Sequence, residues 1–137
     1  MKAAISKSWN RSVQPRKQRK FVHNAPLHIK PKIMLISTLS KELRKKHNKR
    51  NMRLRKGDTV KIMRGQFKGK KGKVDEIETK KDKIYIEGIE HIKKDGTKAF
   101  YPLKASNLMI TELNLDDKKR KKILARKNPN VKENKNG

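Results

Sequence analysis

Apolar residues stand two positions apart in three short segments in the middle of the chain. In an extended chain such residues point to the same face, and this period is typical of a half-buried β-strand. We therefore expect three strands. They are residues 59–63 with Val60 and Ile62 on one face, residues 83–87 with Ile84 and Ile86, and residues 107–111 with Leu108 and Ile110.

Two local signals add a bend and a hairpin to these strands. Val74 and Ile77 are three positions apart, which is out of phase for a straight strand and predicts a bulge near residues 75–76. The Asp-Gly pair within residues 94–97 is typical of a tight hairpin turn, and a short strand follows at residues 99–101. Five short strands predict a mostly β fold closed into a small barrel, because closure removes exposed strand edges.

The segments on both sides of these strands carry helix signals and prolines. Ser40 is a suitable N-cap for a helix over residues 41–47, which Asn48 would end. Asp116 is a suitable cap for a second helix over residues 117–127. Three prolines favour an extended path for the chain before residue 40. They are Pro15, Pro26 and Pro31.

Charge divides the chain more sharply than hydropathy does. Among 137 residues, 40 are basic and 13 acidic, for a net charge of +27. Residues 1–56 hold 18 of the basic residues and one acidic residue, whereas residues 57–115 hold 13 basic and nine acidic residues. We therefore expect a basic N-terminal arm with a short helix (1–48), a β domain (49–115), and a basic C-terminal helix with a disordered tail (116–137). By this division, a chain lacking residues 1–48 would keep its β fold and bind a polyanionic partner poorly.

The composition argues against several classes of protein. Only 32% of residues are apolar and no cysteine is present, so a multidomain enzyme, a thiolate metal site and a large apolar pocket are not expected. The four histidines, His23, His28, His47 and His91, lack the clustered partners of a zinc site. No apolar run is long enough to span a bilayer. We expect no cofactor, no catalytic residue and no contact with membranes.

A glycine-rich basic loop is the most informative motif. Between the strands predicted at residues 59 and 74, three glycines alternate with four cations and one phenylalanine. Backbone without Cβ atoms lets a phosphate approach N–H donors, and the cations release counterions from it. Two interpretations of the glycines remain. Either they let a phosphate approach the backbone, or they only permit the backbone angles that the loop needs. Phe67 either stacks on an unpaired base or, as we favour, packs against the domain.

The residues from Arg55 to about Glu78 resemble the KOW motif, a strand–glycine loop–strand unit of SH3-like barrels. The flanking segments, residues 25–28, 39–44, 50–58 and 116–124, resemble the archaeal and eukaryotic branch of the universal KOW protein of the large ribosomal subunit, the twenty-four/twenty-six family. The resemblance implies a five-stranded SH3-like barrel. It also implies a non-enzymatic ribosomal protein in the cytoplasm, and we expect no homo-oligomer.

The same resemblance implies partners and binding residues. Members of the family bind large-subunit ribosomal RNA near its 5′ end early in assembly, and they lie beside neighbouring ribosomal proteins at the exit of the nascent-peptide tunnel. The RNA-binding positions carried over to this chain are Arg16, Lys17, Arg19, Lys20 and His28 in the arm, Arg50, Arg53, Arg55 and Lys56 at the start of the barrel, and Arg64, Gly65, Gln66, Phe67, Lys68, Gly69, Lys70 and Lys71 in the loop.

Two other binding functions compete with this interpretation. An architectural DNA-binding protein would present a compact basic face with apolar wedges on the barrel, whereas here the excess charge lies in the arms. A KOW transcription elongation factor normally adds a separate α/β domain, for which the chain has no room.

Overall fold

The computed structural model describes residues 12–126. Its elements follow one another as α1 (Pro15–Asn24), α2 (Lys30–Met34), β1 (Ile36–Leu39), α3 (Lys41–His47), β2 (Asn51–Arg53), β3 (Thr59–Ile62), β4 (Lys71–Glu78), β5 (Lys83–Ile86), β6 (Glu90–Ile92), β7 (Lys98–Phe100), the short 3-10 helix η2 (Ala105–Asn107), β8 (Leu108–Glu112) and α4 (Lys118–Ala125). Trp9 and the predicted disordered tail at residues 130–137 fall outside the described residues.

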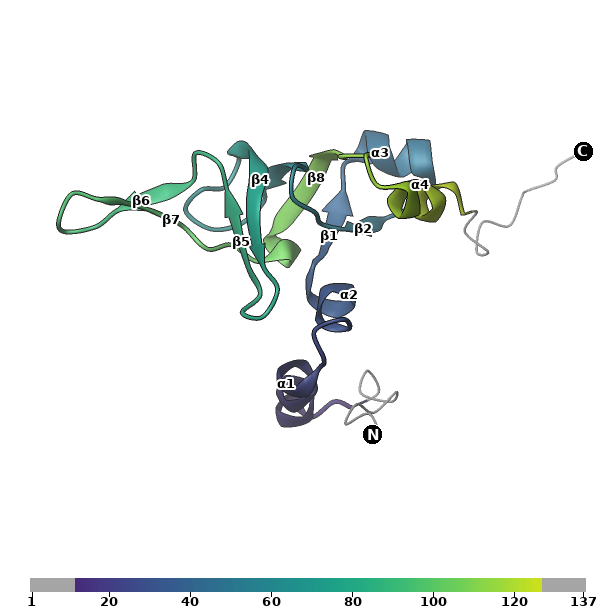
Figure 1. Ribbon diagram of the computed structural model, residues 1–137, viewed down its shortest axis with the longest axis horizontal. Coiled ribbons are helices and arrows are strands. Elements are labelled where there is room, and N and C mark those ends of the chain that lie inside the picture. Colours follow the sequence, from purple (N-terminus) through teal and green to yellow (C-terminus); the bar gives the residue numbers. More distant parts are fainter. Residues whose placement is uncertain (1–11, 127–137) are drawn as a thin grey trace, which may run out of the picture.

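One mixed sheet forms the centre of the molecule, and one hairpin projects from it (Figure 1). The sheet has the strand order β2-β1-β8-β3-β4-β5, in which β1 and β8 are parallel and the other neighbours antiparallel. Among the described strands, β6 and β7 pair with each other and not with the sheet, and they extend away from it. The prediction of a mostly β fold is confirmed. Within residues 12–126, no helix is both long and apolar enough to cross a membrane.

The predicted five-stranded SH3-like barrel is not confirmed. The sheet has six strands, and its outer strands β2 and β5 do not pair with each other within the described residues. On the outer side of β5, Ile84 forms an isolated bridge with Leu103, and Tyr101 N–H donates to the carbonyl of Ile89. The six strands therefore form an open sheet.

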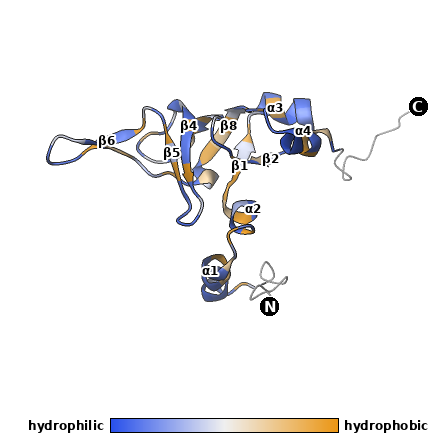
Figure 2. Cartoon of the chain, viewed as in Figure 1, coloured by the Kyte–Doolittle hydropathy of each residue, from blue (hydrophilic) through white to orange (hydrophobic). Residues whose placement is uncertain are grey.

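The three strands predicted from alternation are confirmed, and their apolar faces form the core. Val60 and Ile62 of β3 are fully buried, and so are the corresponding pairs of β5 and β8. Figure 2 shows β5 and β8 as largely apolar and the projecting hairpin as largely hydrophilic. The core cluster comprises Leu35, Leu39, Met52, Leu54, Val60, Ile62, Val74, Ile84, Ile86, Ile89, Leu103, Ala105, Leu108, Ile110 and Leu124.

The predicted bulge and hairpin are also confirmed. The register between β4 and β5 shifts between Val74 and Glu76, which brings Ile77 opposite Ile84. In the turn between β6 and β7, Gly96 has a φ of +83° and Lys93 N–H donates to the carbonyl of Thr97. An L residue with a side chain rarely adopts that φ, so the Asp-Gly pair fixes the turn.

The sheet extends across the domain boundary predicted at residue 49. Strand β1 lies between β2 and β8, and its Leu39 is fully buried. The hydroxyl of Ser37 donates to the carbonyl of Ala105 at 2.7 Å, which satisfies a buried polar group in the same strand. Residues 35–39 therefore belong structurally to the sheet and not to a separate arm.

The expectation of an extended arm is wrong at two of its prolines. Pro15 is the first residue of α1, and Pro31 lies in the first turn of α2. A first-turn N–H has no partner within a helix, so proline costs nothing there and its fixed φ suits the helix. Before Pro26 the expectation holds, because α1 ends at Asn24 and Ala25 is extended.

Both predicted helices at the edges of the sheet are present. Ser40 caps α3 by accepting from Leu43 N–H, and Asn48 ends it in the left-handed conformation. Helix α4 is shorter than predicted, and its cap is Asp117 instead of Asp116. The Asp117 carboxylate accepts from Lys119 N–H at 2.8 Å, which stabilises the positive end of the helix.

Candidate nucleic-acid interface

The predicted RNA-binding residues lie in three groups on different parts of the fold. The first group is on the exposed surface of α1, followed by His28 in the turn before α2. The second surrounds β2 and the turn before β3, where Arg50, Arg55 and Lys56 are exposed and Arg53 is half-buried. The third is the loop between β3 and β4. The three groups lie on different elements, so a single RNA that touches all of them must contact α1, the β2 region and the β3–β4 loop.

Backbone hydrogen bonds hold the loop between β3 and β4 in a compact form. Gly69 N–H donates to the carbonyl of Ile62 at 2.8 Å, and Lys68 N–H donates to that of Gly65. Both glycines have a φ of +91°, and a Cβ added at either would meet no atom within 4 Å. Their conformation therefore requires glycine, while the space beside them stays open for a ligand.

Gly72 has a different role from the other two glycines. It lies in β4, where a Cβ would come within 2.5 Å of Ile86 Cγ2 and 2.7 Å of the carbonyl oxygen of Glu87. Such contacts require the strands to move apart. Gly72 is therefore explained by the close packing of β4 against β5, and binding is not needed to account for it.

Phe67 packs against the protein, as we favoured over base stacking. Its ring meets that of Tyr101 edge-on at a centroid distance of 5.1 Å, and Lys70 Nζ lies 5.2 Å from the centre of the Phe67 ring. His91 contacts the same tyrosine ring at 6.3 Å. Phe67 thus fixes the loop to the base of the β6–β7 hairpin, and the cations of the loop remain exposed.

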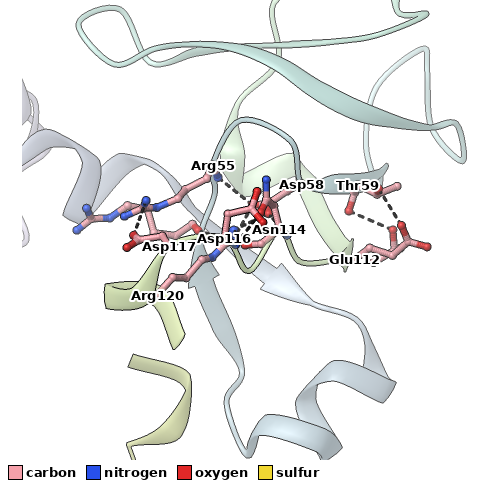
Figure 3. Close-up of polar contacts among 10 residues, drawn as sticks. Arg55, Asp58, Thr59, Glu112, Asn114, Asp116, Asp117 and Arg120 are labelled. Atoms are coloured by element: carbon pink, nitrogen blue, oxygen red, sulfur yellow. Dashed lines mark hydrogen bonds and ion pairs between the residues drawn. The ribbon is translucent and has the colours of Figure 1, made fainter. Parts of the chain in front are cut away.

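A buried ion pair fixes α4 beside the second group (Figure 3). Arg120 donates through both terminal nitrogens to the carboxylate of Asp58, at 2.6 and 2.7 Å, and both side chains are almost completely buried. The same carboxylate accepts N–H groups of Arg55 and Asn114. A buried charge needs such partners, because desolvating it alone costs several kcal/mol.

Arg120 also binds two backbone carbonyls. It donates to the oxygens of Asn114 and Arg53, at 2.7 and 3.2 Å. Its Nε is buried and has no partner within residues 12–126. One guanidinium therefore connects α4, the end of β2 and the turn before β3.

A second ion pair joins the same elements at the surface. Arg55 lies 2.5 Å from the carboxylate of Asp117, the cap of α4. The pKa of Asp117 is lowered, first by the hydrogen bond from Lys119 N–H and then by the nearby positive charge of Arg55. Because Arg55 is engaged in this pair, it contributes less free charge to RNA than its exposed neighbours.

From the sequence alone, Arg120 is placed only within the basic C-terminal helix. The useful signal is its identity, because it is the one arginine within the run Lys118–Lys122. Arginine forms planar two-pronged bonds with a carboxylate that lysine cannot form, and so it is the usual partner of a buried acid. Leu124, four residues later, points to the same face of α4 and is also buried.

Two further cations missed by sequence reasoning lie beside the first group. Lys80 and Lys81, in the turn after β4, line a shallow groove with Arg19, His23 and Lys30. Lys81 also pairs with Glu78 at 2.8 Å, which raises the lysine's pKa and keeps it charged. Lys80 thus adds an exposed cation next to α1, whereas Glu78 offsets the charge of Lys81.

The histidines do not gather in the described part of the chain. His23 lies against Asn24, and His91 against Tyr101. Burial, together with Lys46 and Lys49, lowers the pKa of His47. No group of three or more metal-ligating side chains occurs within residues 12–126.

Comparison with known protein families gives a match that spans all of the residues described by the structure. Residues 12–127 match the family described as the ribosomal proteins L26 of eukaryotes and L24 of archaea. The match includes both basic flanks as well as the strand–loop–strand motif, and it covers well over half of the chain. The chain therefore belongs to this family of large-subunit ribosomal proteins, which unites eukaryotic L26 with archaeal L24.

Proposed function

We propose that the chain is a structural protein of the cytoplasmic large ribosomal subunit that binds ribosomal RNA through the β3–β4 loop, the β2 region and α1. The observation that carries this proposal is the charge of the exposed loop. Residues 64–71 hold four cations and no acid, and none of the four forms an ion pair within the described residues. Their charge is therefore free to neutralise phosphates.

The mechanism is electrostatic and depends on shape. Each phosphate contact releases condensed counterions, which favours binding at low salt without selecting a base sequence. The rigid loop, fixed by Phe67 and by its backbone bonds, fits its cations to one arrangement of phosphates. The three separate groups then favour a folded RNA with surfaces on several sides of the protein over a single straight duplex.

We further propose the location of binding from the family resemblance. The chain binds toward the 5′ end of the large-subunit RNA, acts early in assembly, and lies beside neighbouring ribosomal proteins near the exit of the nascent-peptide tunnel. The extended shape of the molecule supports contact with several partners at once, since α1 and the β6–β7 hairpin project from the sheet in different directions and α4 lies at another side of it.

The family match argues against the two competing functions. It continues through the basic flanks, whereas a KOW elongation factor would resemble this chain only over the motif itself. An architectural DNA-binding protein needs apolar wedges beside a basic face. The aromatic ring of the basic loop instead packs against Tyr101.

Replacing Lys68, Lys70 and Lys71 with alanine tests the binding loop. We expect weaker binding to large-subunit RNA and a flatter dependence of log affinity on log salt, by roughly one unit of slope for each lost phosphate contact. Filter binding at several salt concentrations measures both quantities.

The matched control is alanine at Lys93, Lys94 and Lys98 of the β6–β7 hairpin. It removes the same net charge from another exposed site. We expect this variant to keep a steeper slope than the loop variant. Equal slopes for both variants and the unaltered chain would refute the assignment of the loop.

A further inference from the structure

A pocket beside the second group combines apolar walls with a basic rim. Its volume is about 260 Å³, and α2, β1, β2 and α4 all contribute to it. Ile36 of β1 and Ile123 of α4 both line it and are 38% and 40% exposed. Only a few large apolar side chains of the described chain are so exposed. Two of them thus face one small cavity.

The remaining lining is cationic or neutral. Lys32, Arg53 and Arg55 lie at the pocket together with the amide of Asn51, and no carboxylate is among the described residues that line it. Arg120 also lines it, but Asp58 already neutralises that charge. Lys32 and Arg53 form no ion pair with any residue from 12 to 126, so their charge remains available for an anion.

This combination matches the chemistry of a single nucleotide. A base offers flat faces that pack on aliphatic side chains, an edge that bonds to an amide, and a phosphate that attracts cations. The volume lies just below the range of about 300–1,000 Å³ typical of pockets for drug-sized ligands. It therefore suits one base better than a larger molecule. A purely acidic protein segment would use the cations but not the apolar side chains.

We propose that this pocket receives an unpaired nucleotide of the large-subunit ribosomal RNA, with the base between Ile36 and Ile123 and the adjoining phosphate on Lys32 and Arg53. The proposal rests on the RNA-binding function above and adds a site for base insertion to it. Because α4 forms one wall, the Asp58–Arg120 pair assembles the pocket. RNA recognition through splayed-out single bases is common where helices are interrupted.

A double substitution of the two walls separates base insertion from phosphate binding. Ile36→Thr with Ile123→Thr keeps the branch at Cβ of both side chains and every charge, and removes apolar surface from the pocket. We expect affinity for deproteinised large-subunit RNA to fall about tenfold, as the loss of buried apolar contact implies. The slope of log affinity against log salt should stay unchanged, because no phosphate contact is lost.

Ile92→Thr, at an exposed isoleucine of the β6–β7 hairpin, is the matched control. It should bind like the unaltered chain, and urea unfolding should show all three proteins folded. Equal affinity of the double variant and the control would overturn the proposal and leave the pocket to a protein partner. A loss of affinity with a reduced salt slope would also overturn it, by making the pocket a phosphate site. If the unaltered chain fails to bind the RNA at all, the proposed function itself fails.

Discussion

Replacing Arg120 with alanine is expected to lower the free energy of unfolding by about 3–5 kcal/mol, because it leaves the buried carboxylate of Asp58 without its counter-charge. Asp58 is fully buried and cannot regain water without opening the turn before β3. Small domains have a total stability of only about 5–15 kcal/mol. Urea unfolding followed by far-ultraviolet circular dichroism measures the loss.

Two further variants define the cause of that loss. Lys121→Ala removes the neighbouring exposed cation from the same helix and should change stability by less than about 0.5 kcal/mol. Asp58→Asn combined with Arg120→Ala should cost much less than the sum of the two single changes, because each charge is harmful only without the other. If Arg120→Ala unfolds at the same urea concentration as Lys121→Ala, the buried pair does not hold the fold together.

A chain that begins at Lys49 is expected to lose cooperative folding, whereas one that begins at Met34 should keep it. The shorter chain lacks β1, which pairs with both β2 and β8, and it lacks the buried side chains of Leu35 and Leu39. Truncating one buried leucine commonly costs about 2–5 kcal/mol, so the loss of two approaches the whole stability of a domain. Circular dichroism and urea unfolding of both chains test this expectation.

The chain that begins at Met34 also tests how much the basic arm contributes to RNA binding. It lacks α1 and its cations but retains every strand of the sheet. It should therefore unfold cooperatively and bind large-subunit RNA more weakly than the full chain. A cooperative transition in the Lys49 chain at a similar urea concentration would place the true boundary at residue 49, where the charge distribution alone puts it.

The parts of the fold that the sequence predicts are those with a local signal. Strand β3 carries its own alternation, Ser40 and Asn48 mark the ends of α3, and the pair Asp95–Gly96 marks the hairpin. Each depends on the conformational preferences of neighbouring residues. Such preferences can be inferred from the sequence without knowledge of the tertiary structure.

The parts that the sequence does not predict depend on distant partners. Strand β1 lacks an apolar alternation because its buried position 37 is a serine, which is satisfied by the carbonyl of Ala105, 68 residues away. Strand β2 has only three residues and carries no periodic signal. Closure of the sheet likewise depends on how the outer strands meet, which no local pattern specifies.

The candidate site shows the same division. The exposed cations of the loop are visible as a motif, because their function requires exposure and their spacing is local. The pairing of Asp58 with Arg120 joins residues 62 positions apart, and only the fold shows that this arginine is buried. The pocket between Ile36 and Ile123 arises for the same reason, from elements that are distant in the chain.

The central claim is that exposed cations on a folded β scaffold attach this chain to the RNA of the large ribosomal subunit. Its most direct test is to separate a cell lysate on a sucrose gradient and to follow a tagged copy of the full chain alongside the variant with alanine at Lys68, Lys70 and Lys71. We predict that the full chain travels with large subunits and that the variant shifts toward the unbound fractions. A full chain that remains in the unbound fractions, or travels only with small subunits, would contradict the account.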